Sequence, residues 1–442
     1  MNVYITDVII ENYRGVRELE LSFNAGPGIN ILLGDNGVGK TSILEAIATG
    51  LSGYLEGVSG SFPRHILSSD IRIHTDALGG ASTAIHYATP VAIRCRGVIN
   101  QEDFEWSRIR ERETKNSGAV THTDYSDVGS LKSYARKMTN DTQIMLPVLS
   151  YLSTERLSAP KSLNTKRESS DFADDIEKKL HDRRNGYKGC MRNAIEKDMI
   201  KAWCLKMDME HYFQNAPIPE YEAFKEIVGI TMMVMSELEQ APKIYYSRQF
   251  RDIVYQEDHL PLPISYLSAG YQSLLWIVMD IAFRIALLNP HYGSDMRFTP
   301  GVVLIDELDM HLHPKWQWNV LSALEETFPN IQFIIATHSP ILISSCKHGR
   351  IISIDDYHQT TYIDPPYATD INNVVELVQG SSGIPKHIKE SMNDFDYALN
   401  DGDLDTAHQI LSHMKEQLGD DHRVVKLAAA ELSMDYSSLN ED

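Results

Sequence analysis

The sequence predicts an α/β fold in which helices flank a mixed or parallel sheet, with an inserted helical subdomain and a helical C-terminal region. Two observations indicate the sheet. Over 266–336, helical patterns alternate with short apolar runs, which is typical of parallel strands covered by helices. Upstream, a glycine-rich loop joins the strand-like run Asn30–Leu33 to a helical pattern that begins at Lys40. A third observation, the polar and then helical stretch 158–242, indicates the insertion.

The chain has 442 residues, which allows two or three domains, or one large domain with insertions. We expect a first lobe over 1–157, the helical insertion over 158–245, a second lobe over 246–363, and an acidic, partner-binding helical region over 364–442. Helical patterns separated by Gly-Asp turns mark the last region.

Composition sets limits on the setting of the protein. We see no apolar run long enough for a membrane span and no signal-peptide pattern at the N-terminus. Four widely spaced cysteines without a CxxC pair favour a reduced, cytoplasmic environment. The net charge of −20 argues against a general nucleic-acid binder. The charge is uneven, since 351–442 holds 18 acidic and 5 basic residues, whereas Arg156–Lys201 holds 12 basic and 8 acidic.

Residues 34–41 read Gly-Asp-Asn-Gly-Val-Gly-Lys-Thr, an instance of GxxxxGK[ST] in its required place between a strand and a helix. Backbone N–H groups of such a loop, and of the helix start behind it, cradle the phosphates of a nucleotide. Lys40 adds a positive charge, and the Thr41 hydroxyl is a ligand for Mg²⁺. The predicted cofactors are ATP and Mg²⁺, and the remaining loop contacts are Asn36, Gly37, Gly39 and Ser42.

A second motif is the apolar strand Gly301–Ile305, which ends in two adjacent carboxylates. Neighbouring side chains at a strand end point apart and can take different roles. We expect Asp306 to hold the Mg²⁺, directly or through water, and Glu307 to orient or deprotonate the attacking water.

Residues 267–273, Leu-Ser-Ala-Gly-Tyr-Gln-Ser, open a predicted helix and resemble the LSGGQ signature of ABC-type ATPases. The fold class that this resemblance implies is an ABC-type P-loop ATPase head. In that family the signature serine and glycine cap the γ-phosphate held by the partner subunit. The resemblance therefore implies a homodimer in which Ser268 and Gly270 complete the nucleotide site of the other chain.

Thr337-His338-Ser339-Pro340, after another apolar strand, resembles the ABC switch histidine, so His338 is assigned to the γ-phosphate and the attacking water. Asp309 matches the D-loop position, which crosses the dimer interface in the family. The histidines at 311, 313 and 338 also raise the alternative of a metal site, but no fourth ligand is placed, and a structural role is preferred.

The turn Asn12–Gly15 resembles the N-terminal turn of the RecF and SMC-like branch, which implies that Arg14 lies near the nucleotide. The family also expects a glutamine after the strand that ends near Tyr151. This chain has none there, and Thr154 or Glu155 is left as its replacement.

The sequence resembles AAA-like proteins of the bacterial RecF/OLD branch more closely than transporter or SMC-type ATPases. The gap between Lys40 and Ser268 is long for a transporter ATPase, and no heptad coiled coil of SMC type fills it. The helical tail leaves no room for the Toprim nuclease domain of OLD proteins. The motif set resembles the ATPases of Septu anti-phage systems, which implies a sensor or regulator of a separately encoded, PtuB-like HNH nuclease docked through the C-terminal helices.

Two alternatives stay open. A repair ATPase that clamps duplex DNA would use the basic stretch Arg156–Lys201, although a solvated charged helix explains that stretch as well. A nucleotide-dependent scaffold with little turnover is the other, and the retained Glu307 argues against it.

Overall fold

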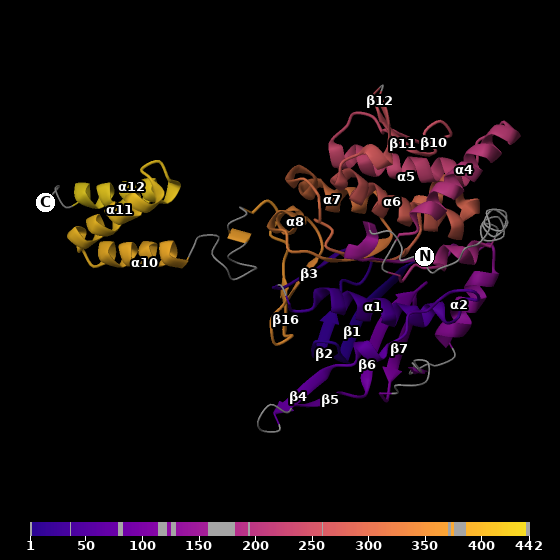
Figure 1. The fold of residues 1–442 in the computed structure, drawn as a ribbon, viewed down its shortest axis with the longest axis horizontal. Coiled ribbons are helices and arrows are strands. Elements are labelled where there is room, and N and C mark those ends of the chain that lie inside the picture. Colours follow the sequence, from indigo (N-terminus) through magenta and orange to yellow (C-terminus); the bar gives the residue numbers. More distant parts are fainter. Residues whose placement is uncertain are drawn as a thin grey trace. The chain divides into compact units, whose positions relative to one another are not determined.

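The computed structural model describes residues 2–35, 37–77, 83–113, 122–124, 130–157, 182–192, 195–258, 260–369, 373–374 and 386–438. The chain divides into two compact units, Met1–Thr369 and Asp370–Asp442, coloured from indigo to orange and in orange to yellow in Figure 1.

A six-stranded sheet with the order β16-β15-β3-β14-β13-β9 forms the centre of the first unit. Its neighbouring strands are parallel except for the antiparallel pair β15 and β16. The predicted mixed sheet is confirmed, and its central strands are apolar runs that are buried along their length, as a sheet covered on both faces requires. The strands are β3 (Gly28–Leu33), β9 (Val148–Leu152), β13 (Gly301–Asp306), β14 (Ile331–Ala336), β15 (Arg350–Ile354) and β16 (Thr360–Ile363).

A second, antiparallel sheet has the order β2-β1-β6-β7-β8. Helix α1 (Lys40–Leu55) contacts strands of both sheets and is buried along most of its length. The turn predicted at 12–15 joins β1 to β2, and Arg14 adopts a left-handed conformation there (φ 48°). The strands are β1 (Val3–Tyr13), β2 (Val16–Ser22), β6 (Val91–Ile99), β7 (Glu102–Arg110) and β8 (His122–Asp124), with a separate hairpin of β4 (Ile73–Ala77) and β5 (Thr83–Tyr87).

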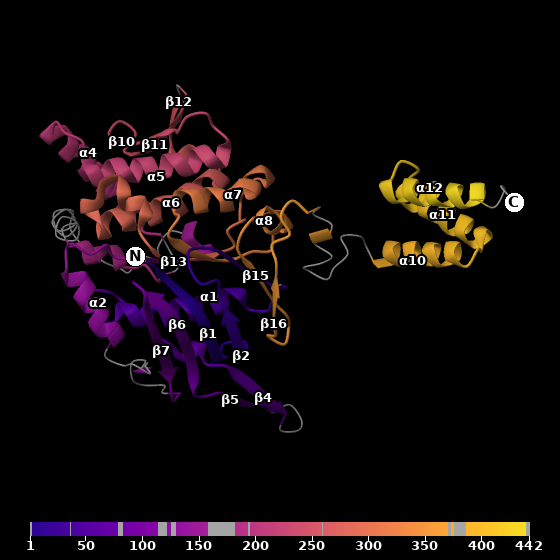
Figure 2. The ribbon, with the colours of Figure 1, turned by 180° about the vertical axis from the view of Figure 1, so that it is seen from behind.

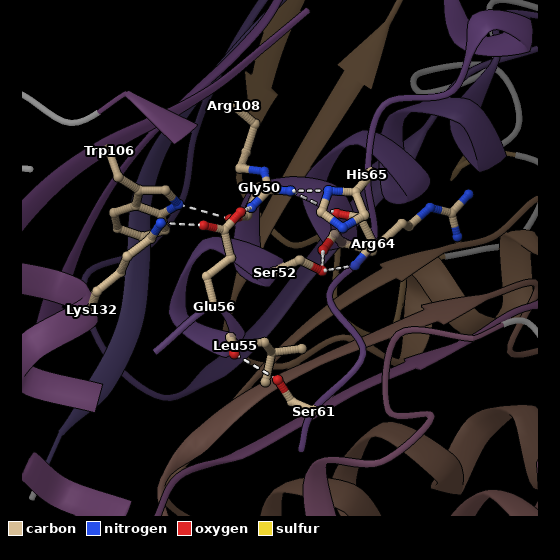
Figure 3. Close-up of polar contacts among 11 residues, drawn as sticks. Gly50, Ser52, Leu55, Glu56, Ser61, Arg64, His65, Trp106, Arg108 and Lys132 are labelled. Carbon is tan, nitrogen blue, oxygen red and sulfur yellow. Dashed lines mark hydrogen bonds and ion pairs between the residues drawn. The ribbon is translucent and has the colours of Figure 1, made fainter. Parts of the chain in front are cut away.

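The C-terminal half of α1 is fixed to the antiparallel sheet by buried polar contacts (Figure 3). The indole of Trp106 on β7 donates to the carbonyl oxygen of Gly50 at 2.7 Å. Arg108, also on β7, is fully buried and forms an ion pair with Glu56, and it donates to the carbonyl of Arg64 at 3.0 Å. Because α1 begins at the glycine-rich loop, these contacts set the position of that loop against the sheet.

A helical layer covers the other face of the central sheet, so the sheet lies between α1 and this layer (Figures 1 and 2). Helix α5 packs against both α6 and α7. The layer consists of α4 (Lys197–Gln214), α5 (Pro219–Ser236), α6 (Ala269–Leu288), α7 (Pro314–Thr327) and α8 (Pro340–Ser345), and α2 (Ser130–Asn140) packs beside α1.

Two local structures differ from the sequence patterns. The stretch 158–242 has a helical sequence pattern from Lys188 on, but α4 begins only at Lys197, because Gly189 lies at φ +66° and a 3₁₀ turn occupies Arg183–Tyr187. The segment before the signature forms an antiparallel sheet that the sequence did not predict, β10 (Lys243–Ser247), β11 (Asp252–Glu257) and β12 (Leu260–Pro263).

Helix α6 is long and apolar enough to cross a membrane on length and composition alone, yet 89% of its most apolar window is buried inside the protein. It also carries a buried ion pair, in which Arg284 Nε donates to Asp280 Oδ2 at 2.8 Å. Both features identify α6 as a core helix. All four cysteines of the chain are buried and unpaired.

The second unit is built from α10 (Lys386–Asn400), α11 (Leu404–Leu418) and α12 (Arg423–Ser438). Asp403 begins α11, where its Oδ1 accepts from the backbone N–H of Thr406 at 3.1 Å. The three helices share an apolar core formed by Phe395, Ala398, Ala407, Leu411, Met414, Val425, Ala428 and Leu432. Within the helical region expected over 364–442, residues 370–372 and 375–385 lie outside the described part of the chain.

Candidate nucleotide-binding site

The glycine-rich loop leaves β3 and leads directly into α1. Gly37 and Gly39 have left-handed backbones (φ 101° and 92°), a conformation that glycine adopts without strain. Gly34 is needed for a different reason, because a Cβ there would lie 2.6 Å from the carbonyl oxygen of Ile354 on β15. The loop therefore lies tightly against two strand ends and presents the N-terminus of α1, a favourable position for phosphate. Asn36 lies outside the described residues.

Lys40, the first residue of α1, is buried with its ammonium group over the loop. Its Nζ donates to the carbonyl oxygens of Gly34 at 2.7 Å and Asp35 at 3.1 Å, and lies 3.5 Å from Nδ1 of His338. Burial lowers the pKa of Lys40, while nearby carboxylates, Asp306 first among them, oppose this shift. The ammonium is thus held where phosphate oxygens would meet it.

Thr41 and Asp306, which are 265 residues apart in sequence, meet at this site. The Thr41 hydroxyl donates to Asp306 Oδ2 at 2.8 Å, and Asp306 is 1% exposed. Burial raises the pKa of Asp306, so a cation beside it would favour the ionised form. A hydroxyl and a carboxylate are hard oxygen donors of the kind that Mg²⁺ prefers, and the pair fits that ion.

Arg156, which the sequence presented only as the start of a basic stretch, fixes the backbone that carries the two carboxylates. It is fully buried. One terminal nitrogen donates to the carbonyl oxygens of Asp306 at 2.7 Å and Ser153 at 3.1 Å, and the other donates to that of Glu307 at 2.9 Å. Glu307 itself has a left-handed backbone (φ 45°). The guanidinium therefore ties the end of β13 to the segment that follows β9.

Asp309 lies beside the residues that flank His338. The Thr337 hydroxyl donates to Asp309 Oδ1 at 2.5 Å and accepts from the backbone N–H of Ser339 at 3.0 Å. Burial lowers the pKa of His338, and the positive charge of Lys40 adds to that shift. This shift favours the uncharged imidazole at neutral pH, a form that can accept a hydrogen bond.

The signature residues occupy the start of α6. Ser268 is the N-cap residue and is exposed, and its hydroxyl makes no capping bond to its own helix. Gly270 packs on the D-loop, since a Cβ there would lie 2.5 Å from the carbonyl oxygen of His311. The structure thus brings Gly270 close to the segment that carries Asp309, while Ser268 stays exposed.

Replacing Gly270 by valine introduces atoms that collide with the His311 carbonyl. We expect the start of α6 to move away from the D-loop, and ATP hydrolysis to fall by about tenfold or more, since a shift near 1 Å at a catalytic site can cost about 100-fold. Steady-state phosphate release checks this. Gly15→Val is the matched control, because nothing lies within 4 Å of a Cβ at Gly15. Equal losses in both variants would show a general effect of the substitution.

The other predicted residues are placed as follows. Arg14 donates from Nε to Asp70 Oδ1 at 2.9 Å and forms an ion pair with Glu45, one turn beyond Thr41 on α1. Thr154 and Glu155 lie in a short 3₁₀ turn next to Arg156, which puts this segment beside the carboxylates. Ser42 is half-buried in the first turn of α1.

The histidine metal site is not supported. His313 instead begins α7, where its Nδ1 accepts from the backbone N–H of Lys315 at 3.3 Å. His311 is exposed at a left-handed backbone position (φ 69°). In the part of the chain that the structure describes, no group of three or more His, Cys, Asp or Glu side chains could hold a metal ion.

Fold and site together define the protein as a P-loop ATPase with an ABC-type head: the loop, Lys40, Thr41, Asp306 and His338 converge at the carboxyl ends of parallel strands. Residues 29–344 match the family described as "AAA domain, putative AbiEii toxin, Type IV TA system". That match covers more than half of the chain, and the protein belongs to this family.

The curated relatives of the chain have low sequence identity to it. The chain is 23% identical over 435 residues to "Retron Vc95 probable ATPase" of Vibrio cholerae serotype O1 biovar El Tor, with 88% of this chain and 81% of the relative covered. It is 22% identical over 352 residues to "Septu protein PtuA" of Bacillus thuringiensis, with 79% and 75% covered. Among solved structures, an SMC head bound to the C-winged helix domain of ScpA is 14% identical with a TM-score of 0.47, covering 82% of this chain and 98% of that one.

Proposed function

We propose that the protein hydrolyses ATP in composite sites shared by two copies of the chain, and that this nucleotide cycle regulates a separately encoded nuclease in anti-phage defence. One observation carries the proposal. Lys40, Thr41, Asp306 and His338 meet on one chain, whereas Ser268 is exposed at the start of α6 and its hydroxyl makes no capping bond. A second copy that supplies this serine would complete the shell around the γ-phosphate.

Each residue then has a defined task. The loop N–H groups and Lys40 hold the β- and γ-phosphates, and Thr41 and Asp306 hold Mg²⁺, which supplies charge neutralisation for phosphoryl transfer. Glu307 orients and deprotonates the attacking water. His338, kept neutral by burial and by Lys40, contacts the γ-phosphate and the water. Arg156 positions Glu307 through its backbone carbonyl.

Bound ATP then stabilises the dimer, because it contacts both copies of the chain. Ser268 and Gly270 of one chain bind the γ-phosphate held by the other, so ATP favours the closed dimer and hydrolysis weakens it. A ligand shifts such an equilibrium only by its differential affinity for the two states. Asp309 accepts a hydrogen bond from Thr337, the residue before the switch histidine. In this proposal Asp309 crosses the dimer interface and couples closure of the dimer to that histidine.

The nuclease partner docks, in this proposal, on the second unit. Three packed helices form an independent core there, and that part of the chain has an excess of acidic residues. Such a charged helical surface suits a basic partner. The similarity to retron and Septu proteins supports a role in defence.

Removing residues 370–442 tests the docking. We expect the shortened chain to bind ATP like the full chain and to lose co-purification of the nuclease encoded beside it, as read by pull-down from cells that express both. The full chain carrying Lys40→Ala is the control, since it should bind the nuclease without ATP. Undiminished pull-down by the shortened chain would contradict the docking role.

The alternative function, a clamp on duplex DNA, depends on the basic stretch that begins at Arg156. Arg156 itself is not available for DNA, because its side chain is fully buried and donates to the backbone carbonyl of Asp306. Residues 158–181 lie outside the described part of the chain. A duplex-binding titration at low salt, with and without ATP, separates the two functions, because only a clamp binds more tightly with ATP.

A further inference from the structure

The loop between β15 and β16 lies directly against the phosphate-binding loop. His358 Nε2 is 3.2 Å from the carbonyl oxygen of Val38, inside the glycine-rich sequence. Ile354, the last residue of β15, has its carbonyl oxygen packed against Gly34. Because β15 and β3 are parallel neighbours, the loops that leave their carboxyl ends emerge side by side.

This loop has a defined conformation held by Asp355. One carboxylate oxygen, Oδ1, accepts from the backbone N–H groups of Tyr357 at 2.9 Å and Gln359 at 2.7 Å. The backbone N–H of His358 also donates to the Asp355 carbonyl at 3.0 Å, and His358 takes a left-handed conformation (φ 60°). The turn presents the side chain of Tyr357, which is 84% exposed. A large aromatic ring is thus displayed on a fixed turn beside the loop.

The order of the strands determines which end of a bound nucleotide reaches this turn. Thr41 meets Asp306 at the end of β13, and His338 follows β14, so the γ-phosphate end lies toward β14 and β13. In the sheet, β15 lies on the opposite side of β3 from these two strands. A triphosphate laid along the glycine-rich loop therefore directs its nucleoside end toward β15 and the Asp355–Gln359 turn.

We propose that the ring of Tyr357 stacks on the nucleobase of the bound ATP. The inference rests on the proposed ATP site and adds to it the residue that binds the base. Stacking uses the π face that every base has, so it strengthens binding without selecting adenine over guanine. The ring carries the contact, and the hydroxyl is not required.

Equilibrium binding in the presence of Mg²⁺ tests the inference on the full chain, with ATP and inorganic tripolyphosphate as probes. Alanine substitution of a stacking aromatic costs about 1–3 kcal/mol per base, so Tyr357→Ala should weaken ATP binding by about fivefold or more. It should leave tripolyphosphate unchanged, because that probe has no base. Tyr357→Phe should bind both probes like the wild type. Tyr397→Ala, at a tyrosine that is 77% exposed on α10, is the matched control.

Two outcomes overturn the inference alone. ATP binding by Tyr357→Ala that equals the wild type shows that the ring makes no contact with the base. Equal weakening of both probes shows that the turn only supports the phosphate loop. A wild-type chain that binds neither probe would instead contradict the proposed ATP site, and the inference with it. Lys40→Ala, which should lose both probes, confirms that the assay reports that site.

Discussion

Replacing Glu307 by glutamine reduces ATP hydrolysis by about 100-fold or more, because general-base catalysis by a positioned side chain contributes about 100- to 10,000-fold. The amide keeps the shape of the side chain and loses its capacity to take a proton. Lys40, Thr41 and Asp306 are untouched, so ATP and Mg²⁺ binding remain. The measurement is steady-state phosphate release beside a nucleotide-binding titration.

The matched control for Glu307→Gln is Glu326→Gln, the same change at an exposed position on α7. It should hydrolyse ATP at the wild-type rate. The scaffold alternative gives a different result, namely turnover in Glu307→Gln that cannot be distinguished from the wild type. That outcome would show that Glu307 does not catalyse hydrolysis, and that the protein acts through nucleotide binding alone.

Replacing Arg156 by methionine should lower both stability and activity. The buried guanidinium donates to the carbonyl oxygens of Ser153, Asp306 and Glu307, and methionine leaves all three without these donors. The carbonyl oxygens of Ser153 and Glu307 still accept from the backbone N–H groups of residue 156 and Met310, both at 3.1 Å. A buried polar group that loses its partner costs about 1–3 kcal/mol, so we expect a loss of about 1–3 kcal/mol in the free energy of unfolding, chiefly from the carbonyl of Asp306. Thermal unfolding measures this loss, and phosphate release measures the activity.

Lysine at position 156 separates the charge from the geometry. It keeps a positive charge but lacks the planar fork that reaches several carbonyls at once, so Arg156→Lys should recover part of the stability and little of the hydrolysis. Wild-type unfolding and turnover in Arg156→Met would contradict the role assigned to this residue.

Much of the site could be predicted because its parts are local motifs with a known backbone context. The glycine-rich loop needs a strand before it and a helix after it, and both patterns are strong around Lys40. Asp306 and Thr337 each end or follow a fully buried strand, and parallel strands bring such ends to one edge. The convergence of Thr41 with Asp306 follows from that rule.

The parts that were missed depend on contacts that sequence patterns do not contain. Arg156 stands in a polar segment and resembles any solvated charge, and only the fold shows that it lies against the end of β13. The strand β12 contains Pro261 and Pro263, which weaken a strand pattern, yet at a sheet edge they cost few ladder bonds. No sequence pattern singles out Tyr357, because its position beside the glycine-rich loop depends on the pairing of β15 with β3.

The central claim is that each nucleotide site is shared between two chains, and mixing two inactive variants tests it most directly. Lys40→Ala destroys the phosphate site and keeps Ser268 and Gly270. Ser268→Glu does the reverse, because it leaves the phosphate site of its own chain intact and puts a negative charge against the γ-phosphate of the partner. In a two-fold symmetric dimer, an equimolar mixture puts half of the chains in mixed dimers with one complete site each, so hydrolysis should return to roughly a quarter of the wild-type rate. Activity that stays at the sum of the two separate variants would contradict a shared site and place the whole reaction within one chain.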